Sequence, residues 1–466
     1  MKIIIVGAGG IGFQIAKQLI NENKNVVIIE KDPKVAKHTS NYLDCMVVNE
    51  EGNNIEVLKK AGIDKADFFI SVTDSDEVNM ISCGLVASEF NAPFKIARVR
   101  NIDYTNTQFL ESSFLGIDYM VNPEIEASKV ITRFIEHGAI SDILFFEKTR
   151  FQMRNITITD NSPFNNKTLR EIKSSSPIDF LIAFILRDNS YIIPSGDTVV
   201  QENDNLYIVA TEENLERLFM EMGKFKIKLN RIVIVGGGRI GSYVADHLLQ
   251  KQMSDLSFIR RLTRSFIHKW KRNIIIIDKD IERCNLLSEC FPNALVLNED
   301  ISDEGIYEES QFSDYDLIVT TTDNQELNIV TAVYAKTLGI KRSIALVNKN
   351  NYINIAANLG IDVTVSQKNS MVNSILKLIR KGNIKNIYSF LDGMVEVIEL
   401  SVENSEISGS KIKEIKLPPQ TLIVSVTREN QNIIPGGNST INNGDYIIVI
   451  ARKESISKIE NIFTGK

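Results

Sequence analysis

Apolar and polar positions follow a pattern that is written twice along the chain. Each copy begins with an apolar stretch that runs into a glycine-rich turn, "KIIIVGAGGIG" at 2–12 and "RIVIVGGGRIG" at 231–241. After each turn, apolar residues recur at helical spacing, and a further apolar stretch ends in an acid, Glu30 or Asp278. Continuously apolar strands that alternate with amphipathic helices indicate a parallel sheet covered on both faces.

The two copies correspond over their whole length. The stretch "DFFISVTDSDEVN" (67–79) matches "DLIVTTTDNQELN" (316–328), and "KIARVRN" (95–101) matches "SIALVNK" (343–349). Near the end of each copy, strand-like segments are joined by Pro, Gly, Asn and Asp turns, as in "YIIPSG" and "NIIPGG". We therefore expect an α/β protein with two Rossmann-type, doubly wound parallel-sheet domains, each followed by a small α+β domain.

Changes in this pattern set the expected domain boundaries. They give a first Rossmann domain, a connecting helix and a small domain at 1–122, 123–139 and 140–224, then a second set at 230–367, 368–382 and 383–466. The second Rossmann domain carries an insertion, 251–272, which is rich in Lys and Arg and contains the only Trp of the chain. The insertion is interpreted as a solvated surface excursion or as a contact with an acidic partner or a lipid face.

Composition excludes several classes of protein. A net charge of −6 argues against a general nucleic-acid binder, which would need a basic surface. No apolar run is long enough to cross a bilayer, and nothing resembles a signal peptide, so we expect a cytoplasmic product. The four cysteines form no C-x-x-C pair and are expected to be buried, inert thiols. The histidines have no ligand-like spacing, so no metal site is predicted.

The glycine turns point to dinucleotide binding. In the first, Gly7 permits the sharp turn off the strand, Gly9 leaves room for a pyrophosphate, and Gly12 lets the helix pack on the sheet. Backbone N–H groups at the helix start then face the phosphates. Glu30 would hold the ribose hydroxyls and repel a 2′-phosphate, which favours NAD or an adenine nucleotide over NADP. The alternative is a glycine turn that serves packing alone.

The second copy has the same parts, Gly236, Gly238, Gly241 and Asp278, but differs after its fifth strand. There the first copy has Arg98 and Arg100, which the spacing places on one side of a strand, where they would meet additional phosphate charge. The second copy has Leu346 and Asn348 instead. The first half is therefore the expected sensor of phosphate state, unless both arginines only form surface salt bridges.

Taken together, the tandem order and the motifs "GAGGIG", "SVTDSDEVNM", "IARVRN" and "IIPSG…ENDNLYIVA" resemble the TrkA family. These proteins are the peripheral regulatory subunits of bacterial Trk potassium-uptake systems, built from tandem regulator-of-potassium-conductance (RCK) units. The resemblance covers essentially the whole chain. It implies a cytoplasmic gating ring, a homotetramer, docked on a potassium-conducting membrane subunit and reaching the membrane only through that subunit, apart from a minor role for the basic insertion.

The resemblance also implies NAD(H) and ATP or ADP as ligands of the Rossmann crevices. The residues that it assigns to the first crevice are Gly7, Ala8, Gly9, Gly10, Ile11, Gly12, Glu30, Glu51, Thr73, Asp74, Arg98 and Arg100. Those of the second are Gly236, Gly238, Arg239, Ile240, Gly241, Asp278 and Thr322. The chain departs from the family at "NEEG" (49–52), where the family has Gly-Asp near the adenine and Glu51 would substitute.

Three functional classes fit parts of this sequence. A binding turn with no catalytic group beside it suits a sensor, in which ligand binding shifts a conformational equilibrium. An NAD-dependent dehydrogenase would need an acid or base beside the nicotinamide, and the small domains offer no His or Lys dyad for this role. A regulator of potassium or cation efflux would use the same domains, often fused behind membrane spans. Regulation of uptake is the preferred reading.

Overall fold

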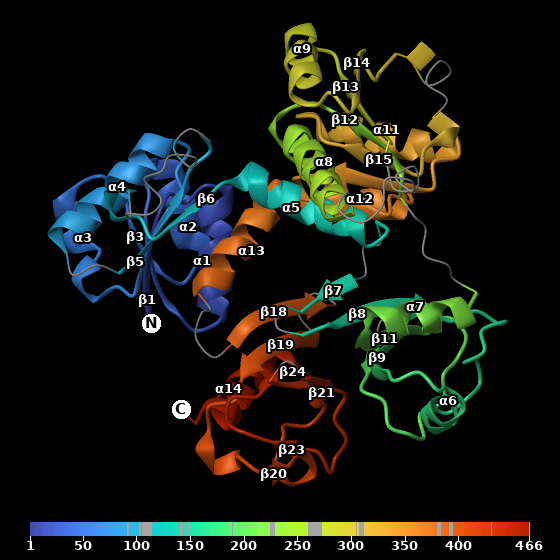
Figure 1. The fold of residues 1–466 in the computed structure, drawn as a ribbon. Helices are drawn as coiled ribbons and strands as arrows, with labels where there is room; N and C mark the ends of the chain where they lie inside the picture. Colours follow the sequence, from blue (N-terminus) through green and yellow to red (C-terminus); the bar gives the residue numbers. More distant parts are fainter. Residues whose placement is uncertain are drawn as a thin grey trace. The chain divides into compact units, whose positions relative to one another are not determined.

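The computed structural model describes residues 1–465 apart from 91–92, 102–103, 105–113, 140–142, 147–148, 189, 224–228, 260–272, 304, 307–311, 380–383, 391–394 and 430. The described chain forms two compact units (Figure 1). One unit comprises 1–141 and 227–376, and the other comprises 142–226 and 377–466. Each unit thus combines one segment from either copy of the repeat.

The first unit contains two parallel sheets of identical topology. The first sheet has the strand order β3-β2-β1-β4-β5-β6, and the second has β14-β13-β12-β15-β16-β17. The strands of the first sheet are Lys2–Val6, Asn25–Ile29, Met46–Val48, Phe68–Ser71, Phe94–Arg98 and Tyr119–Val121 for β1 to β6. Those of the second are Arg231–Val235, Asn273–Asp278, Leu295–Asn298, Leu317–Thr320, Arg342–Leu346 and Val363–Val365 for β12 to β17. Successive strands are added on one side of β1 as far as β3 and on its other side from β4 onward, which is the Rossmann arrangement that the sequence predicts.

Helices cover these sheets and begin where capping residues direct them. Asp32 accepts hydrogen bonds from the backbone N–H groups of Lys34 and Val35, so α2 starts at Pro33, a few residues after β2 ends. The helices of the first copy are Gly10–Asn21, Pro33–Tyr42, Ile55–Lys60, Asp76–Glu89 and Pro123–Glu136 for α1 to α5. Those of the second are Arg239–Ile259, Ile281–Cys290, Gln325–Thr337, Asn350–Asn358 and Gln367–Ile379 for α8, α9, α11, α12 and α13.

The connecting helices pack on the opposite copy of the repeat. In α5, the side chains of Ala127 and Ile131 belong to the buried core of the second sheet, together with Ile232 and Leu248. Helix α13 lies beside α1 (Figure 1), where Gln14 donates a hydrogen bond to the side chain of Asn369 at 3.0 Å. The two sheets of the first unit are therefore joined by an exchange of helices, which the repeat pattern by itself does not reveal.

The second unit contains two antiparallel sheets, β10-β9-β11-β8-β7 and β18-β19-β24-β21-β22, and a small pair β20-β23. Side chains of both larger sheets, including Phe184, Val209, Val397 and Ile448, share one buried cluster. The strands β7 to β11 are Ile143–Phe145, Phe151–Thr157, Leu181–Arg187, Ser190–Ile192 and Asn205–Thr211. The strands β18 to β24 are Ile384–Phe390, Val395–Ser401, Ser410–Lys411, Leu422–Arg428, Gln431–Ile433, Thr440–Ile441 and Tyr446–Ala451. Helices α6, α7 and α14 are Leu169–Ser175, Glu212–Glu221 and Ile456–Thr464.

The predicted α/β architecture is confirmed, whereas the expectation of uniformly buried thiols is wrong. Cys83 and Cys284 are buried, but Cys45 is half-buried and Cys290 is exposed at the end of α9. Burial raises the pKa of the Cys83 thiol to about 12. In the described part of the chain, no helix combines the length and apolarity that a bilayer span requires. Of the basic insertion, α8 includes the backbone as far as Ile259, while its side chains and residues 260–272 lie outside the described structure.

Candidate nucleotide-binding crevices

The two glycine turns have matching backbone geometry. Gly7 and Gly236 both have φ of 95°, a left-handed conformation that a side chain would strain. A Cβ placed on Gly12 would lie 1.9 Å from the carbonyl oxygen of Gly7, and a Cβ on Gly241 would lie 2.0 Å from that of Gly236. In both copies the last glycine therefore lets the helix pack against the turn.

The middle glycine of each turn faces open space. A Cβ on Gly9 or on Gly238 would meet no atom within 4 Å. Packing therefore does not account for these two glycines, whereas close approach of a ligand to the backbone does. The residues present thus fit a pyrophosphate held by N–H groups at the helix start, as in dinucleotide-binding folds.

An acid ties each turn to the next strand. Glu30 accepts a hydrogen bond from the backbone N–H of Ala8 at 2.6 Å and another from that of Asp32 at 2.8 Å. Asp278 accepts the equivalent bonds from Gly237 at 2.7 Å and Asp280 at 2.9 Å. The carboxylate of Glu30 or Asp278 therefore lies beside the glycine turn, where the ribose of a bound dinucleotide would lie.

In the first crevice, the side chain of Arg98 contacts the loop that follows β4. Its Nη1 donates to the carbonyl oxygen of Thr73 and to the carboxylate of Asp74, each at 3.0 Å. The side chain of Arg98 is 11% exposed, and its buried Nε has no hydrogen-bond partner in the described part of the protein. A buried guanidinium N–H without an acceptor is costly, so this group is available to an anionic ligand.

Arg100 lies two residues beyond the end of β5 and binds the start of α5. Its Nε and Nη2 donate to Oε1 of Glu124 at 2.9 and 2.7 Å. The Glu124 side chain is only 5% exposed, and its other oxygen, Oε2, has no partner among the described residues. Because β5 ends at Arg98, strand alternation does not fix the direction of Arg100, which the contact with α5 sets instead.

The remaining residues assigned to the first crevice lie around its turn. Gly10 and Ile11 form the first residues of α1. Glu51 is exposed, and the adjacent Gly52 packs so closely on Val6 that a Cβ there would lie 2.2 Å from it. The loop with Glu51 is thereby placed beside the strand end that leads into the first glycine turn.

Two buried asparagines, which the sequence patterns did not single out, link the ends of neighbouring strands by hydrogen bonds. Asn79 accepts from the N–H and hydroxyl of Thr73 and donates to the carbonyl oxygens of Thr73 and Arg98. Asn328 makes the same set of bonds with Thr322 and Leu346. Their signal in the sequence is the final Asn shared by the repeated segments 67–79 and 316–328.

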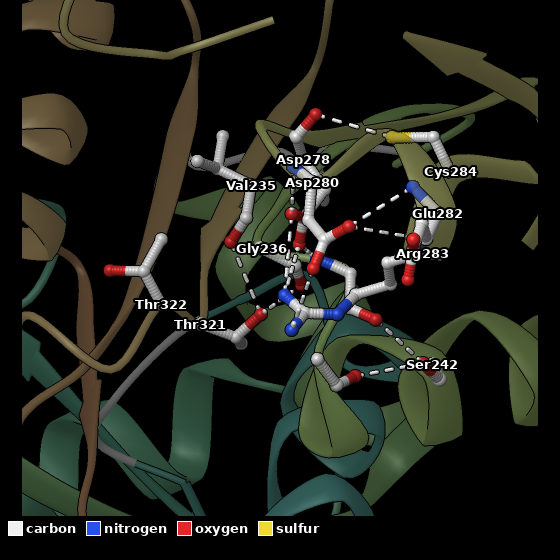
Figure 2. Close-up of polar contacts among 12 residues, drawn as sticks. Val235, Gly236, Ser242, Asp278, Asp280, Glu282, Arg283, Cys284, Thr321 and Thr322 are labelled. Carbon is white, nitrogen blue, oxygen red and sulfur yellow. Dashed lines mark hydrogen bonds and ion pairs between the residues drawn. The ribbon is translucent and has the colours of Figure 1, made fainter. Parts of the chain in front are cut away.

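The second crevice is a cavity of about 450 Å³ at the carboxyl ends of the strands of the second sheet. Gly236, Gly238, Asp278 and Thr322 line it. Figure 2 shows Asp278, Gly236 and Thr321, which belong to the acid, the turn and the loop after β15, close to one another. The other assigned residues lie outside this lining: Ile240 is part of the sheet core, Gly241 packs on Gly236, and Arg239 reaches Glu124 at 3.9 Å.

Acidic side chains outnumber basic ones around the second crevice. This crevice is lined by the acids Asp278, Glu299, Asp300 and Asp323, against Lys279 and Arg283. Arg283 extends its Nη1 to within 3.0 Å of Asp278 (Figure 2), and this hydrogen bond raises the pKa of the guanidinium. A ribose would therefore compete with Arg283 for the carboxylate of Asp278.

No group of three or more His, Cys, Asp or Glu side chains in the described regions is arranged to hold a metal ion.

Family models match the first parallel-sheet domain, the later part of the second from residue 257 onward, and both small domains. The TrkA-N domain model matches residues 3–123 and 257–367, and the TrkA-C domain model matches 153–223 and 397–464. Among solved structures, the GsuK RCK domain superimposes with a TM-score of 0.55 at 19% identity, covering 100% of this chain and 95% of that one. The GsuK channel bound to NAD gives a TM-score of 0.54 at 20% identity, covering 100% and 79%. These two likenesses concern the fold.

Curated relatives extend over the full length. The chain is 30% identical to the Trk system potassium uptake protein TrkA of Halomonas elongata, over 99% of this chain and 98% of the relative. It is also 30% identical to TrkA homolog 1 of Methanosarcina mazei, over 99% and 100%. With tandem TrkA-N and TrkA-C domains and full-length relatives of this kind, the chain belongs to the TrkA family of Trk system potassium uptake proteins.

Proposed function

We propose that the protein is the cytoplasmic, nucleotide-sensing regulatory subunit of a Trk-type potassium uptake system. NAD(H) or ATP and ADP bind in the Rossmann crevices, and the bound ligand changes the shape of a ring that docks on a potassium-conducting membrane subunit. The ring is a homotetramer, and the protein reaches the membrane through that partner. The names of the full-length relatives support the assignment to potassium uptake. The GsuK channel, which shares the fold, has been solved with NAD.

The observation that carries this proposal is the contact between Arg100 and Glu124. Arg100 follows the strand end at which the phosphates of a first-crevice ligand would arrive. Glu124 begins α5, whose Ala127 and Ile131 belong to the core of the second sheet. A phosphate that competes with Glu124 for Arg100 therefore acts on the helix that joins the two halves.

Competition at Arg100 gives the ligand its differential affinity. A ligand shifts a conformational equilibrium only as far as it binds the two conformations unequally. ATP carries one phosphate more than ADP, and Arg98 with its unpaired Nε adds a second donor at the same edge. About 1.4 kcal/mol of differential binding shifts the population tenfold at each site, and identical sites in a ring multiply the effect.

We infer that the protein performs no catalysis on its nucleotide. Each turn is surrounded by groups that bind and orient: backbone N–H donors, Glu30 or Asp278, and the threonines held by Asn79 or Asn328. The second crevice, with its excess of acids, is expected to bind polyphosphates more weakly than the first.

Calorimetric titration of the full chain with ATP, ADP, NAD and NADH tests the binding proposal. Arg100→Ala is expected to bring the affinities for ATP and ADP closer together and to abolish ATP-dependent potassium flux in vesicles that contain the membrane subunit. Arg231→Ala is the matched control, because Arg231 is half exposed and pairs with Asp314 at the opposite end of the second sheet. Indifference to all four nucleotides, or their conversion at a productive rate, would contradict the proposal.

A further inference from the structure

Lys368, in the first turn of α13, lies against the first glycine turn. A Cβ placed on Gly10 would lie 3.3 Å from Nζ of Lys368, 3.5 Å from its Cε and 3.6 Å from its Cδ. The following residue, Asn369, accepts a hydrogen bond from Gln14 on α1 at 3.0 Å. The end of the lysine side chain therefore lies in contact with position 10 and would have to shift by a few tenths of an ångström to admit a Cβ there.

The internal repeat gives this contact a counterpart with different charges. In the second turn, Arg239 stands at the position that Gly10 has in the first, and Glu124 stands in α5 where Lys368 stands in α13. Arg239 and Glu124 approach each other to 3.9 Å. The contact between α5 and the second turn therefore joins a cation and an anion, whereas the contact between α13 and the first turn places a lysine next to a glycine.

Lys368 also lies at the carboxyl edge of the second sheet. The preceding backbone N–H, that of Gln367, donates to the side-chain oxygen of Asn348 at 3.1 Å. Asn348 stands where the first half has Arg100. Lys368 and Asn348 thus hold, in the second half of the repeat, the positions that Glu124 and Arg100 hold in the first.

The ammonium group of Lys368 has no hydrogen bond or ion pair within the described structure. Partial burial lowers its pKa, because the charged form loses hydration. A partly desolvated cation without a counter-ion gains from an anion that reaches it. Phosphate oxygens are such anions, and the second crevice has no arginine after β16 to take them.

We propose that Lys368 binds the terminal phosphate of a nucleotide in the second crevice. A lysine from α13 thus takes the place of the arginine pair that the second half lacks. Movement of Lys368 toward the second crevice also frees Gly10, so occupation of one crevice alters the surroundings of the other turn. This inference rests on the proposed nucleotide-sensing function and adds the second-site residue that distinguishes a triphosphate from a diphosphate.

Variants that close one crevice at a time allow a test in the full chain. Gly9 has an extended backbone and open space around it, so Gly9→Asp places a carboxylate at the phosphate position without steric conflict. Gly238→Asp does the same in the second half. In the Gly9→Asp background, Lys368→Gln is expected to weaken ATP binding about tenfold, as befits a hydrogen bond between charged groups, and to leave ADP binding little changed.

Lys377→Gln is the matched control, because Lys377 is an exposed lysine on the same helix. Unchanged ATP affinity of Lys368→Gln in the Gly9→Asp background would overturn the inference. A loss of ATP affinity that appears only in the Gly238→Asp background would also overturn it, because the lysine would then act at the first crevice. Absence of ATP binding to the second crevice would overturn it as well. The last two outcomes leave the nucleotide-sensing proposal intact, which fails only if the unmodified chain binds none of the nucleotides.

Discussion

Arg100 and Glu124 form a two-donor contact in which Nε and Nη2 of the arginine share one carboxylate oxygen, at 2.9 and 2.7 Å. The arginine belongs to the first parallel-sheet domain, and the glutamate begins a helix that packs into the core of the second. The second carboxylate oxygen of Glu124 is buried without a partner in the described chain. The contact therefore links the two parallel-sheet domains while one buried oxygen of its carboxylate stays without a hydrogen bond.

Arg100→Ala is expected to destabilise the first unit by about 2 kcal/mol. Removing Arg100 leaves the buried carboxylate with only Arg239 nearby, at 3.9 Å. That remaining cation and the solvent access to Arg100 keep the loss below the about 3–5 kcal/mol of a fully buried pair. Urea unfolding of the single variants and of Arg100→Ala with Glu124→Gln measures the coupling. If the double variant is no more stable than Arg100→Ala alone, the buried charge of Glu124 is not the source of the loss.

Gly12→Ala is expected to lower stability by about 2 kcal/mol or more, because its Cβ would overlap the carbonyl oxygen of Gly7. Gly241→Ala should behave alike. Gly9→Ala, at a position with free space, should leave the melting temperature unchanged while weakening nucleotide binding. Equal melting temperatures for Gly12→Ala and Gly9→Ala would contradict this division of roles.

Glu30→Gln is expected to weaken NAD binding about tenfold, through loss of a charge-assisted hydrogen bond to the ribose. The same change should reduce the preference for NAD over NADP, because the carboxylate no longer repels a 2′-phosphate. Titration calorimetry with both dinucleotides, in the Gly238→Asp background, gives the two affinities. An unchanged ratio of NAD to NADP affinity would show that Glu30 does not face the ribose.

Asp316 is expected to make part of the stability pH-dependent. Burial alone would raise its pKa, but the Lys341 ammonium and the backbone N–H groups of Arg231 and Asn230 outweigh burial and lower it. A carboxyl group with a lower pKa in the folded state stabilises the fold above its unfolded value of about 3.8, and this contribution is lost as the pH falls through the folded value. Asp316→Asn should therefore cost stability at pH 7 and progressively less below pH of about 4. Urea midpoints of both proteins across this range provide the check.

Thiol labelling should separate the cysteines by exposure. Cys290 is expected to react with iodoacetamide in the native protein, whereas Cys83 should stay protected until the fold opens, because burial raises the pKa of its thiol to about 12. Mass spectrometry of peptides after timed labelling follows both sites. Early modification of Cys83 would indicate local opening of the first sheet domain.

Much of the architecture could be predicted from the sequence because it depends on local patterns. The apolar stretches, the glycine spacing and the acids at Glu30 and Asp278 establish two Rossmann-type domains, since each strand, turn and helix start is determined within a few tens of residues. The repeated order of these signals also identified the family. The buried asparagines Asn79 and Asn328 occupy equivalent positions in the two copies of the repeat. Their hydrogen bonds, however, depend on strand ends that only the fold brings together.

The sequence by itself determined which segments are strands, where the glycine turns lie and that the unit is duplicated. Only the tertiary structure decided that α5 packs on the second sheet and α13 beside α1, which brings Glu124 to Arg239 and Lys368 to Gly10. An amphipathic helix carries its apolar face in its sequence but not the identity of the surface that covers it. That choice depends on burial between segments far apart in the chain, and here it places the charged ends of two helices between two crevices.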